Sequence, residues 1–250
     1  MAILSRLRRP KPAPAPPDTL RAAAEAGHVE AQMLYAQALL DGAAGQPRDP
    51  ARGFSWFCIA AGAGHAPGLN MRGRCLEQGW GTTRDLAAAA ASYRAAAALG
   101  DPWGRYNLAN MQLRGRGVPR DRLAAYALFE AAARDGHAKS MNLVARFHDE
   151  GWDRPRDPAI ALQWYRRSAE AGDYRGRHNL AVWHAERGQW QEAVGLWQAA
   201  LPEATEDILA AMAQVTAIAC ANAPTPELKR LAGEIAARLR PQPAADSRAR

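Results

Sequence analysis

Cysteine is scarce in this chain, since only three occur in 250 residues. Cys58, Cys75 and Cys220 have no spacing that is typical of a metal site or a redox pair. An odd and sparse count of this kind is typical of free thiols in a reducing compartment. The sequence therefore argues against a disulfide scaffold, a zinc site and a thiol-based redox enzyme.

Long apolar runs are also missing. The N-terminal sequence MAILSRLRRPKPAPAPPDT holds an apolar run of only three residues, at 2–4, which is too short for the core of a signal peptide. Nothing elsewhere in the sequence approaches the length of a membrane span. We therefore expect no signal peptide, no transmembrane segment and a cytoplasmic location.

Net positive charge is missing from the middle of the chain. The net charge is +7, but residues 1–20 carry four cations against one carboxylate, and residues 228–250 carry six against two. These two ends account for the whole excess. A folded nucleic-acid-binding surface would carry its cations on the fold itself. Nucleic-acid binding through the basic tails is therefore the less favoured alternative.

The alternation of residues that is typical of β-strands is absent, whereas alanine recurs in blocks such as LAAAAASYRAAAAL at 86–99. This composition predicts an all-α protein. The excess of Arg over Lys is consistent with a GC-rich bacterial source. The basic, proline-rich segment 1–17 and the segment 241–250 are expected to be disordered tails.

The chain repeats itself at a period of about 36 residues. A glycine followed by His or Asp recurs at spacings of 37, 36, 36 and 36, and an Arg-Asp pair and an aromatic residue recur every 36. The marker glycines are Gly27, Gly64, Gly100, Gly136 and Gly172. The pairs are Arg48-Asp49, Arg84-Asp85, Arg120-Asp121 and Arg156-Asp157. The aromatic residues are Phe57, Tyr93, Phe129 and Tyr165.

Each repeat has the pattern of two antiparallel helices. The first is expected to begin after the marker glycine and to run about 13 residues, with small residues that allow close helix packing. The second is expected to begin at the aspartate, an N-cap, and to end at the next marker glycine. The sequence LRGRGVPRD at 113–121 is then a turn between helices, because a phosphate-binding loop would need a preceding strand and a Lys-Ser/Thr ending.

These marks resemble the Sel1-like repeat family, a branch of the tetratricopeptide-like helical solenoids. The sequence YNLANMQLRGRGVPRDRLAAYALFEAAARDGH at 106–137 matches the family pattern nearly throughout. The resemblance implies a right-handed α/α superhelical solenoid of four to five repeats, over residues 18–202. Two capping helices are expected within 203–240, the second starting at Thr225-Pro226. Arg72 departs from the pattern, because the family has leucine there.

No catalytic constellation is found. His28, His65 and His137 occupy the same corner of different repeats, so no shared metal site is expected. By resemblance, first helices line a concave groove, at positions three, six, ten and fourteen after the marker glycine. The residues that this gives for partner binding are Asn70, Arg74, Trp103, Tyr106, Asn110, Arg114, Lys139, Asn142, Arg146, Arg175 and His178. A solvated face that binds nothing is the alternative for these positions.

Arginine, asparagine and aromatic residues dominate this set, and they suit a peptide backbone or a carboxylate. The sequence therefore predicts a non-enzymatic interaction scaffold, or adaptor, which binds an extended or acidic segment of another protein. No cofactor and no small-molecule substrate are expected. A regulatory subunit of an enzyme, or of an envelope or signalling assembly, is the alternative that family analogy leaves open.

Overall fold

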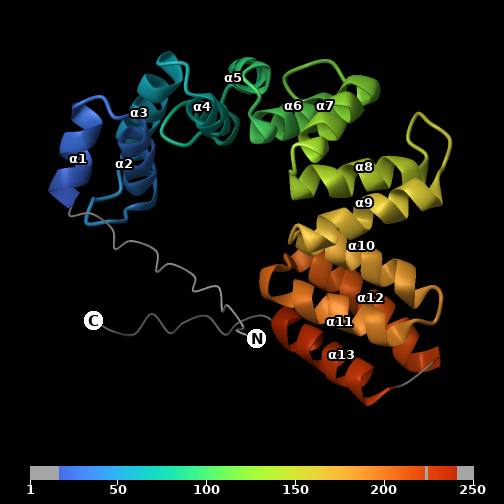
Figure 1. Cartoon of the computed structure of the whole chain (residues 1–250). Helices are drawn as coiled ribbons and strands as arrows, with labels where there is room; N and C mark the ends of the chain where they lie inside the picture. The colour runs from blue at the N-terminus through green and yellow to red at the C-terminus, as the bar shows by residue number, and fades with distance from the viewer. Residues whose placement is uncertain (1–16, 223–224, 241–250) are drawn as a thin grey trace, which may run out of the picture. The chain divides into compact units, whose positions relative to one another are not determined.

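The computed structural model describes residues 17–222 and 225–240 (Figure 1). The tails expected at 1–17 and 241–250 lie outside the described residues, except for Pro17. Every regular element in the described ranges is a helix. These helices are α1 (Pro17–Glu25), α2 (Val29–Asp41), α3 (Pro50–Gly62), α4 (Ala66–Gln78), α5 (Leu86–Ala98), α6 (Pro102–Arg114), α7 (Arg122–Arg134), α8 (Ala138–Glu150), α9 (Pro158–Glu170), α10 (Tyr174–Ala185), α11 (Trp190–Ala200), a 3₁₀ turn (Leu201–Glu203), α12 (Glu206–Asn222) and α13 (Pro226–Leu239).

The recurring aspartates begin the second helix of each regular repeat. The Asp49 side chain accepts a hydrogen bond from the backbone N–H of Arg52, and Asp85, Asp121 and Asp157 make the equivalent bond. Each bond satisfies one of the free N–H groups that a helix leaves at its start. The N-caps that the sequence predicts are therefore confirmed.

The marker residues also act as predicted at the start of the first helices. Gly64, Gly100, Gly136 and Gly172 have φ between 77 and 96°, the left-handed conformation in which a helix commonly ends. The His or Asp that follows is a cap, as where His65 Nδ1 accepts from the N–H of Gly68. Among the described residues no group of three or more His, Cys, Asp or Glu side chains could hold a metal ion.

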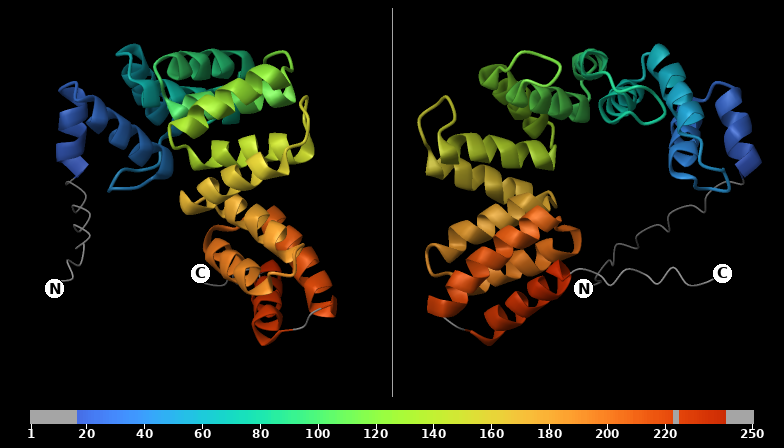
Figure 2. Two further views of the ribbon diagram at one scale, coloured as in Figure 1. Left: turned by 45° about the vertical axis from the view of Figure 1, so that its right-hand side comes forward. Right: turned by 180° about the vertical axis from the view of Figure 1, so that it is seen from behind.

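The chain divides into two compact units, which we name unit 1 and unit 2. Of the described residues, unit 1 contains 17–104 and 116–118, and unit 2 contains 105–115, 119–222 and 225–240. The division falls within α6, inside the segment that the sequence predicts as one solenoid. In unit 1, helices α1 to α5 each pack on the next, and in unit 2 the same holds from α7 to α11 (Figure 2).

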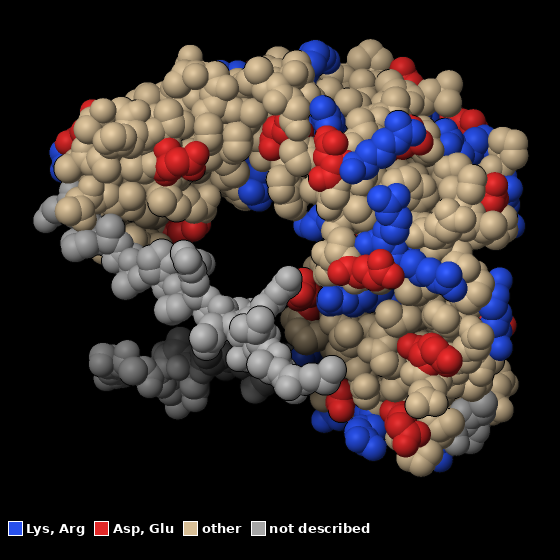
Figure 3. Space-filling view, viewed as in Figure 1, with Lys and Arg blue, Asp and Glu red and all other residues tan. Residues whose placement is uncertain are grey.

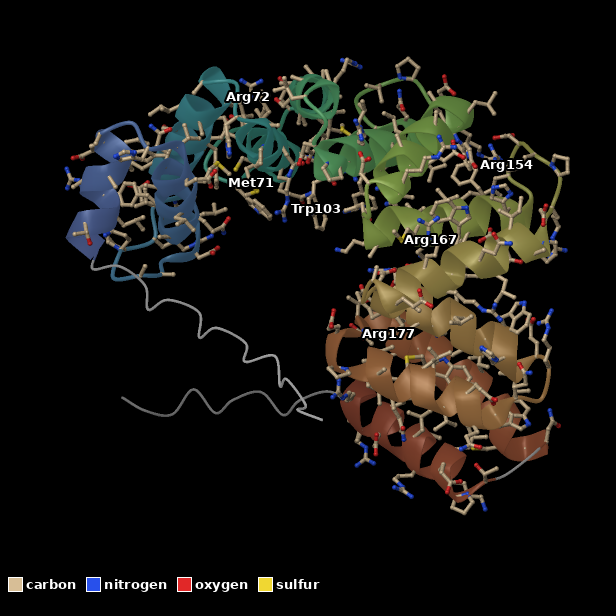
Figure 4. All side chains as sticks on the ribbon, in the orientation of Figure 1. Met71, Arg72, Trp103, Arg154, Arg167 and Arg177 are labelled. Atoms are coloured by element: carbon tan, nitrogen blue, oxygen red, sulfur yellow. The ribbon has the colours of Figure 1, made fainter. Side chains whose placement is uncertain are left out.

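The core of unit 1 contains one polar exception to the repeat pattern. Phe57 and Tyr93 are fully buried between the helices of successive repeats. Arg72, labelled in Figure 4, stands where the next repeats carry Leu108 and Val144, and its Nε donates to Ser92 Oγ at 3.0 Å. The serine thus pairs with an arginine that would otherwise sit half-buried without a partner.

Unit 2 has a larger core that continues into the C-terminal helices. Phe129 and Phe147 pack at 6.3 Å between ring centroids, and Trp197 of α11 is fully buried. The two helices expected after the repeats are α12 and α13, which pack on α10 and α11 respectively. Thr225 caps α13 by accepting from the N–H of Leu228 at 3.2 Å.

Small residues bring neighbouring helices into backbone contact, as the sequence predicts. A Cβ added to Gly104 would lie 2.6 Å from the Ala96 Cβ, and one on Gly176 would lie 2.3 Å from Ser168 Oγ. No larger side chain fits at these two crossings. In the described part of the chain, none of the helices combines the length and apolar character that crossing a bilayer requires.

Candidate functional site

The predicted partner-binding residues fall in both units. Asn70, Arg74 and Trp103 belong to unit 1, and the other eight belong to unit 2. Asn70 is buried, whereas Trp103, at the start of α6, is 44% exposed (Figure 4). The guanidinium of Arg74 stacks over the Trp80 ring, 5.2 Å from its centroid. The predicted residues therefore form two separate sets, one in each unit.

A cavity of about 270 Å³ in unit 2 brings seven of these residues together. Its walls come from α6, α8 and α10, with one residue from α12. The lining residues are Tyr106, Asn110, Arg114, Lys139, Asn142, Leu143, Arg146, Asp173, Arg175 and Asp207. We call this the unit 2 cavity. Lys and Arg side chains, with Asp and Glu among them, are visible over the same unit in Figure 3.

Helical spacing places these side chains on shared faces. Tyr106, Asn110 and Arg114 are four residues apart along α6, so they lie one above the other on one side of the helix. Lys139, Asn142 and Arg146 follow spacings of three and four along α8, with the same result. Seven of the positions that the sequence predicts by resemblance therefore converge on one cavity.

His178 is the one predicted residue of unit 2 that does not line the cavity. Its side chain is 6% exposed, and its Nδ1 accepts a hydrogen bond from Trp197 Nε1 at 3.2 Å. Burial lowers the pKa of His178 to about 4, so the ring is neutral at neutral pH. The structure places this histidine in the core between α10 and α11.

Four cations and two carboxylates face one another in the unit 2 cavity. Arg114 is exposed and has no ion pair among the described residues, so its guanidinium is available to a ligand. Arg146 pairs with Glu150 at 2.8 Å and stacks over Trp152, with 4.8 Å from guanidinium to ring centroid. The cavity has a net positive charge with mixed signs at its walls.

The α10 side of the cavity is set by a contact with the C-terminal helices. Arg175 Nη2 lies 3.8 Å from Asp207 Oδ2 and 3.5 Å from Thr205 Oγ1, and its guanidinium stacks 4.5 Å over the Tyr174 ring. These contacts hold Arg175 beside the cavity rather than in solvent. Asp207 belongs to α12, which is outside the repeats.

Tyr106 is half-buried in the wall that α6 contributes to the cavity. Burial raises the pKa of Tyr106, which keeps the hydroxyl protonated and able to donate. Its ring packs against Phe129 at 5.9 Å and against His137 at 5.0 Å between centroids. The side-chain amide of Asn110 donates to the Tyr106 carbonyl at 2.9 Å, which fixes the amide along the helix.

Sequence reasoning missed three lining residues: Leu143, Asp173 and Asp207. Asp173 could have been found, because it follows a marker glycine and caps α10, where its Oδ2 accepts from the N–H of Gly176 at 3.0 Å. Leu143 directly follows a predicted position on the same helix. Asp207 carries no repeat signal, so only the packing of α12 on α10 brings it to the cavity.

Unit 1 has a smaller set of polar residues around a cavity of about 280 Å³, which we call the unit 1 cavity. Arg74 lines this cavity beside Trp80, and its Nη1 donates to the Met71 sulfur at 3.5 Å. Trp80 is half-buried beneath Arg74, as Trp152 of unit 2 is beneath Arg146. The full lining is Gln37, Leu40, Asp41, Arg48, Met71, Arg74 and Trp80.

Comparison with known proteins gives a family match over most of the helical repeats. The sequence model of the Sel1 repeat matches residues 29–65, 66–101, 104–137 and 138–173. Each matched segment begins at the start of, or within, the first helix of a pair and ends at the residue after a marker glycine. No curated protein sequence matches the chain.

Solved structures with the same fold come from several bacteria. The protective antigen c5321 of uropathogenic Escherichia coli, which has an SLR fold, is 27% identical with a TM-score of 0.69. The match covers 89% of this chain and 48% of the antigen, so this chain spans about half the length of that protein. A Sel1 repeat protein from Oxalobacter formigenes is 19% identical with a TM-score of 0.73, over 89% and 99% of the two chains.

The immunity protein Pa5087 of Pseudomonas aeruginosa also has this fold. It is 15% identical, with a TM-score of 0.57 over 84% of this chain and 80% of its own. Sequence identity at this level shows a common fold alone. The neighbours therefore support an all-α solenoid of helix pairs, as the sequence predicts.

Proposed function

The chain belongs to the Sel1 repeat family, whose members are generally protein-interaction scaffolds, and from this premise we propose that it is a non-enzymatic adaptor. Its unit 2 cavity would bind an extended, acidic segment of another protein. The observation that carries this proposal is the convergence of Arg114, Lys139, Arg146 and Arg175 on one cavity. The cytoplasmic location and the chemistry of the partner stay predictions.

The charge pattern favours a peptide carboxylate over a nucleic acid. A carboxylate of the partner would pair with Arg114, which has no ion pair among the described residues. Asp173 and Asp207 stand in the same cavity and would repel a continuous row of phosphates. A peptide that carries single acidic residues avoids this repulsion, because its charges are discrete and its other groups are neutral.

The structural neighbours do not identify the partner. The name of c5321 describes a protective antigen, and that of Pa5087 an immunity protein. Neither description states a binding site that corresponds to the unit 2 cavity. The proposal for this chain therefore rests on its own residues and on the general role of its family.

The proposal can be tested with labelled peptides and a charge-reversal variant. The probes are fluorescein-labelled glycine–serine peptides that carry glutamate, together with the matching glutamine analogues, measured by fluorescence anisotropy. We expect the wild type to prefer the glutamate peptides, and Arg114→Glu/Arg146→Glu to lose at least about tenfold in affinity, since two favourable charge contacts become repulsive.

A matched control changes the same charge elsewhere in unit 2. Arg166 and Arg230 are exposed on α9 and α13 and do not line the cavity. Arg166→Glu/Arg230→Glu should keep the wild-type affinity. If the wild type binds glutamate and glutamine peptides equally, or if the control loses as much affinity as the cavity variant, then the unit 2 cavity does not bind acidic segments.

A further inference from the structure

The unit 2 cavity contains a buried amide with unused hydrogen-bonding capacity. Asn142 lines the cavity and is only 4% exposed. Its Oδ1 accepts from Asn179 Nδ2 at 2.7 Å, and this is its one side-chain hydrogen bond among the described residues. The amide NH₂ of Asn142 is therefore oriented by Asn179 and left without an acceptor in the described protein.

A buried acceptor without a partner lies in the same cavity. Asp173 is 5% exposed, and its Oδ2 accepts from the N–H of Gly176 and from Ser168 Oγ, at 3.0 and 3.3 Å. Its other oxygen, Oδ1, is buried and has no hydrogen-bond partner among the described residues. A buried carboxylate oxygen in this state costs free energy unless a ligand or a water molecule donates to it.

One donor and one acceptor, both nearly buried, match the chemistry of a peptide group. A peptide main chain offers a carbonyl oxygen and an N–H at regular spacing. A phosphodiester backbone offers acceptors alone, so it would satisfy Asn142 and leave Asp173 in repulsion. The pair therefore favours a peptide main chain over a phosphodiester backbone, independently of the surrounding cations.

We propose that Asn142 and Asp173 anchor the main chain of the segment that the unit 2 cavity binds. Asn142 donates its amide N–H to a backbone carbonyl, and Asp173 accepts from a backbone N–H. Asn179 is a positioning residue that acts by fixing the Asn142 amide. This inference rests on the proposed function and adds how the segment is held. The cations of the cavity bind the acidic side chains of the segment, whereas Asn142 and Asp173 bind its main chain.

Backbone esters give the most direct test. In the glutamate peptides described above, each amide is replaced in turn by an ester, which removes a single N–H and keeps every side chain. Anisotropy should show one position at which the ester weakens binding to the wild type, by roughly tenfold. The same ester should not change the affinity of the Asp173→Asn variant. The asparagine side chain can still cap α10, but its NH₂ group replaces the oxygen that would accept from the peptide N–H.

Substitutions test the Asn142 half of the proposal. Asn142→Leu, which keeps the shape of the side chain and removes the donor, should weaken binding by roughly tenfold. The loss should be equal for glutamate and glutamine peptides, since a main-chain contact does not depend on the side chain. Asn179→Ala should weaken binding in the wild type but add nothing in the Asn142→Leu background, as expected for a positioning residue.

The chain supplies matched controls in unit 1. Asn70 occupies the position of Asn142 two repeats earlier and is also buried, and Asp101 caps α6 as Asp173 caps α10. Asn70→Leu and Asp101→Asn should lower thermal stability in circular dichroism as much as their counterparts, and leave peptide affinity unchanged. This comparison separates a loss of binding from a loss of folding.

The outcomes distinguish this inference from the proposed function. If the glutamate peptides bind and Arg114→Glu/Arg146→Glu abolishes binding, but no ester position matters and Asn142→Leu behaves like Asn70→Leu, then the main-chain anchor is wrong and the acidic-segment site stands. If no glutamate peptide binds the wild type, the proposed function fails and the anchor fails with it.

Discussion

Unit 1 and unit 2 are built from the same repeat but have different cavities. The stack of Arg74 over Trp80 in unit 1 has an equivalent two repeats later, where Arg146 stacks over Trp152 in unit 2. The distances from guanidinium to ring centroid are similar, at 5.2 and 4.8 Å. Only the unit 2 cavity gathers four cations and receives a residue from α12. The comparison shows that the repeat fixes where side chains stand, whereas the residues at these positions decide what they can bind.

The largest expected effect concerns the turn between the two helices of a repeat. Gly81 in unit 1 has φ of 71°, and an added Cβ would lie 2.0 Å from the carbonyl oxygen of Pro50. Asp153, its counterpart in unit 2, has φ of 53° and an exposed side chain 3.5 Å from Arg122. Gly81→Asp should cost at least about 3 kcal/mol through backbone clash.

The reverse change in unit 2 should be nearly neutral. Asp153→Gly loses one exposed ion pair and relieves the left-handed strain, so the free energy of unfolding should change by less than about 1 kcal/mol. Urea denaturation followed by circular dichroism measures both variants. If Gly81→Asp and Asp153→Gly lower the free energy of unfolding equally, then the two turns do not differ in their packing.

A second difference between the units is their expected response to acid. Burial lowers the pKa values of His137 and His178, both in unit 2, to about 4 from the ordinary 6.5. Each ring therefore binds a proton more tightly in the unfolded chain than in the folded one. The contribution of each neutral, buried histidine to the free energy of unfolding is complete above pH 6.5 and is lost as the pH falls toward 4. The expected loss at pH 5 is up to about 2 kcal/mol for each histidine.

The double variant His137→Asn/His178→Gln removes the two rings whose pKa values burial lowers to about 4, and it should reduce this part of the pH dependence. Asparagine still caps α8, and the glutamine side-chain oxygen can still accept from Trp197. Urea denaturation at a series of pH values, followed by tryptophan fluorescence, gives the two curves. Parallel curves for variant and wild type would show that these histidines do not set the acid sensitivity of unit 2.

The smallest expected effect is a difference in peptide affinity between matching substitutions in the two arginine–tryptophan stacks. Arg146→Glu alone should weaken binding of the glutamate peptides by roughly fivefold, because it places repulsion in the unit 2 cavity. Arg74→Glu makes the same change on the equivalent stack in unit 1 and should alter the affinity less than about twofold. A larger effect of Arg74→Glu would place the acidic-segment site in the unit 1 cavity.

Much of the fold could be predicted from the sequence, because the repeat depends on local chemistry. Asp49 and its equivalents cap helices wherever the chain places them, and Gly64 and its equivalents end helices in a left-handed conformation. The departure at Arg72 was visible too. Its partner Ser92 was not, since the two residues are 20 apart and meet only when α4 packs on α5.

The candidate site was predicted less completely. Positions on α6 and α8 follow from helical periodicity, which is why seven predicted residues line the unit 2 cavity. His178 obeys the same periodicity but is buried, because Trp197 of the irregular last repeat packs against it. Periodicity gives the face of a helix and leaves open whether another helix covers that face.

The sequence by itself determined the helices, their caps, the period of the repeat and the membership of a helical solenoid family, because each depends on contacts within one repeat or between equivalent positions. Only the tertiary structure decided which side chains share a cavity and which buried polar groups lack a partner. Asp207 approaches Arg175, and Asn179 orients Asn142, through the packing of α12 and α8 on α10. Such long-range packing depends on the whole core, so no local pattern in the chain encodes it.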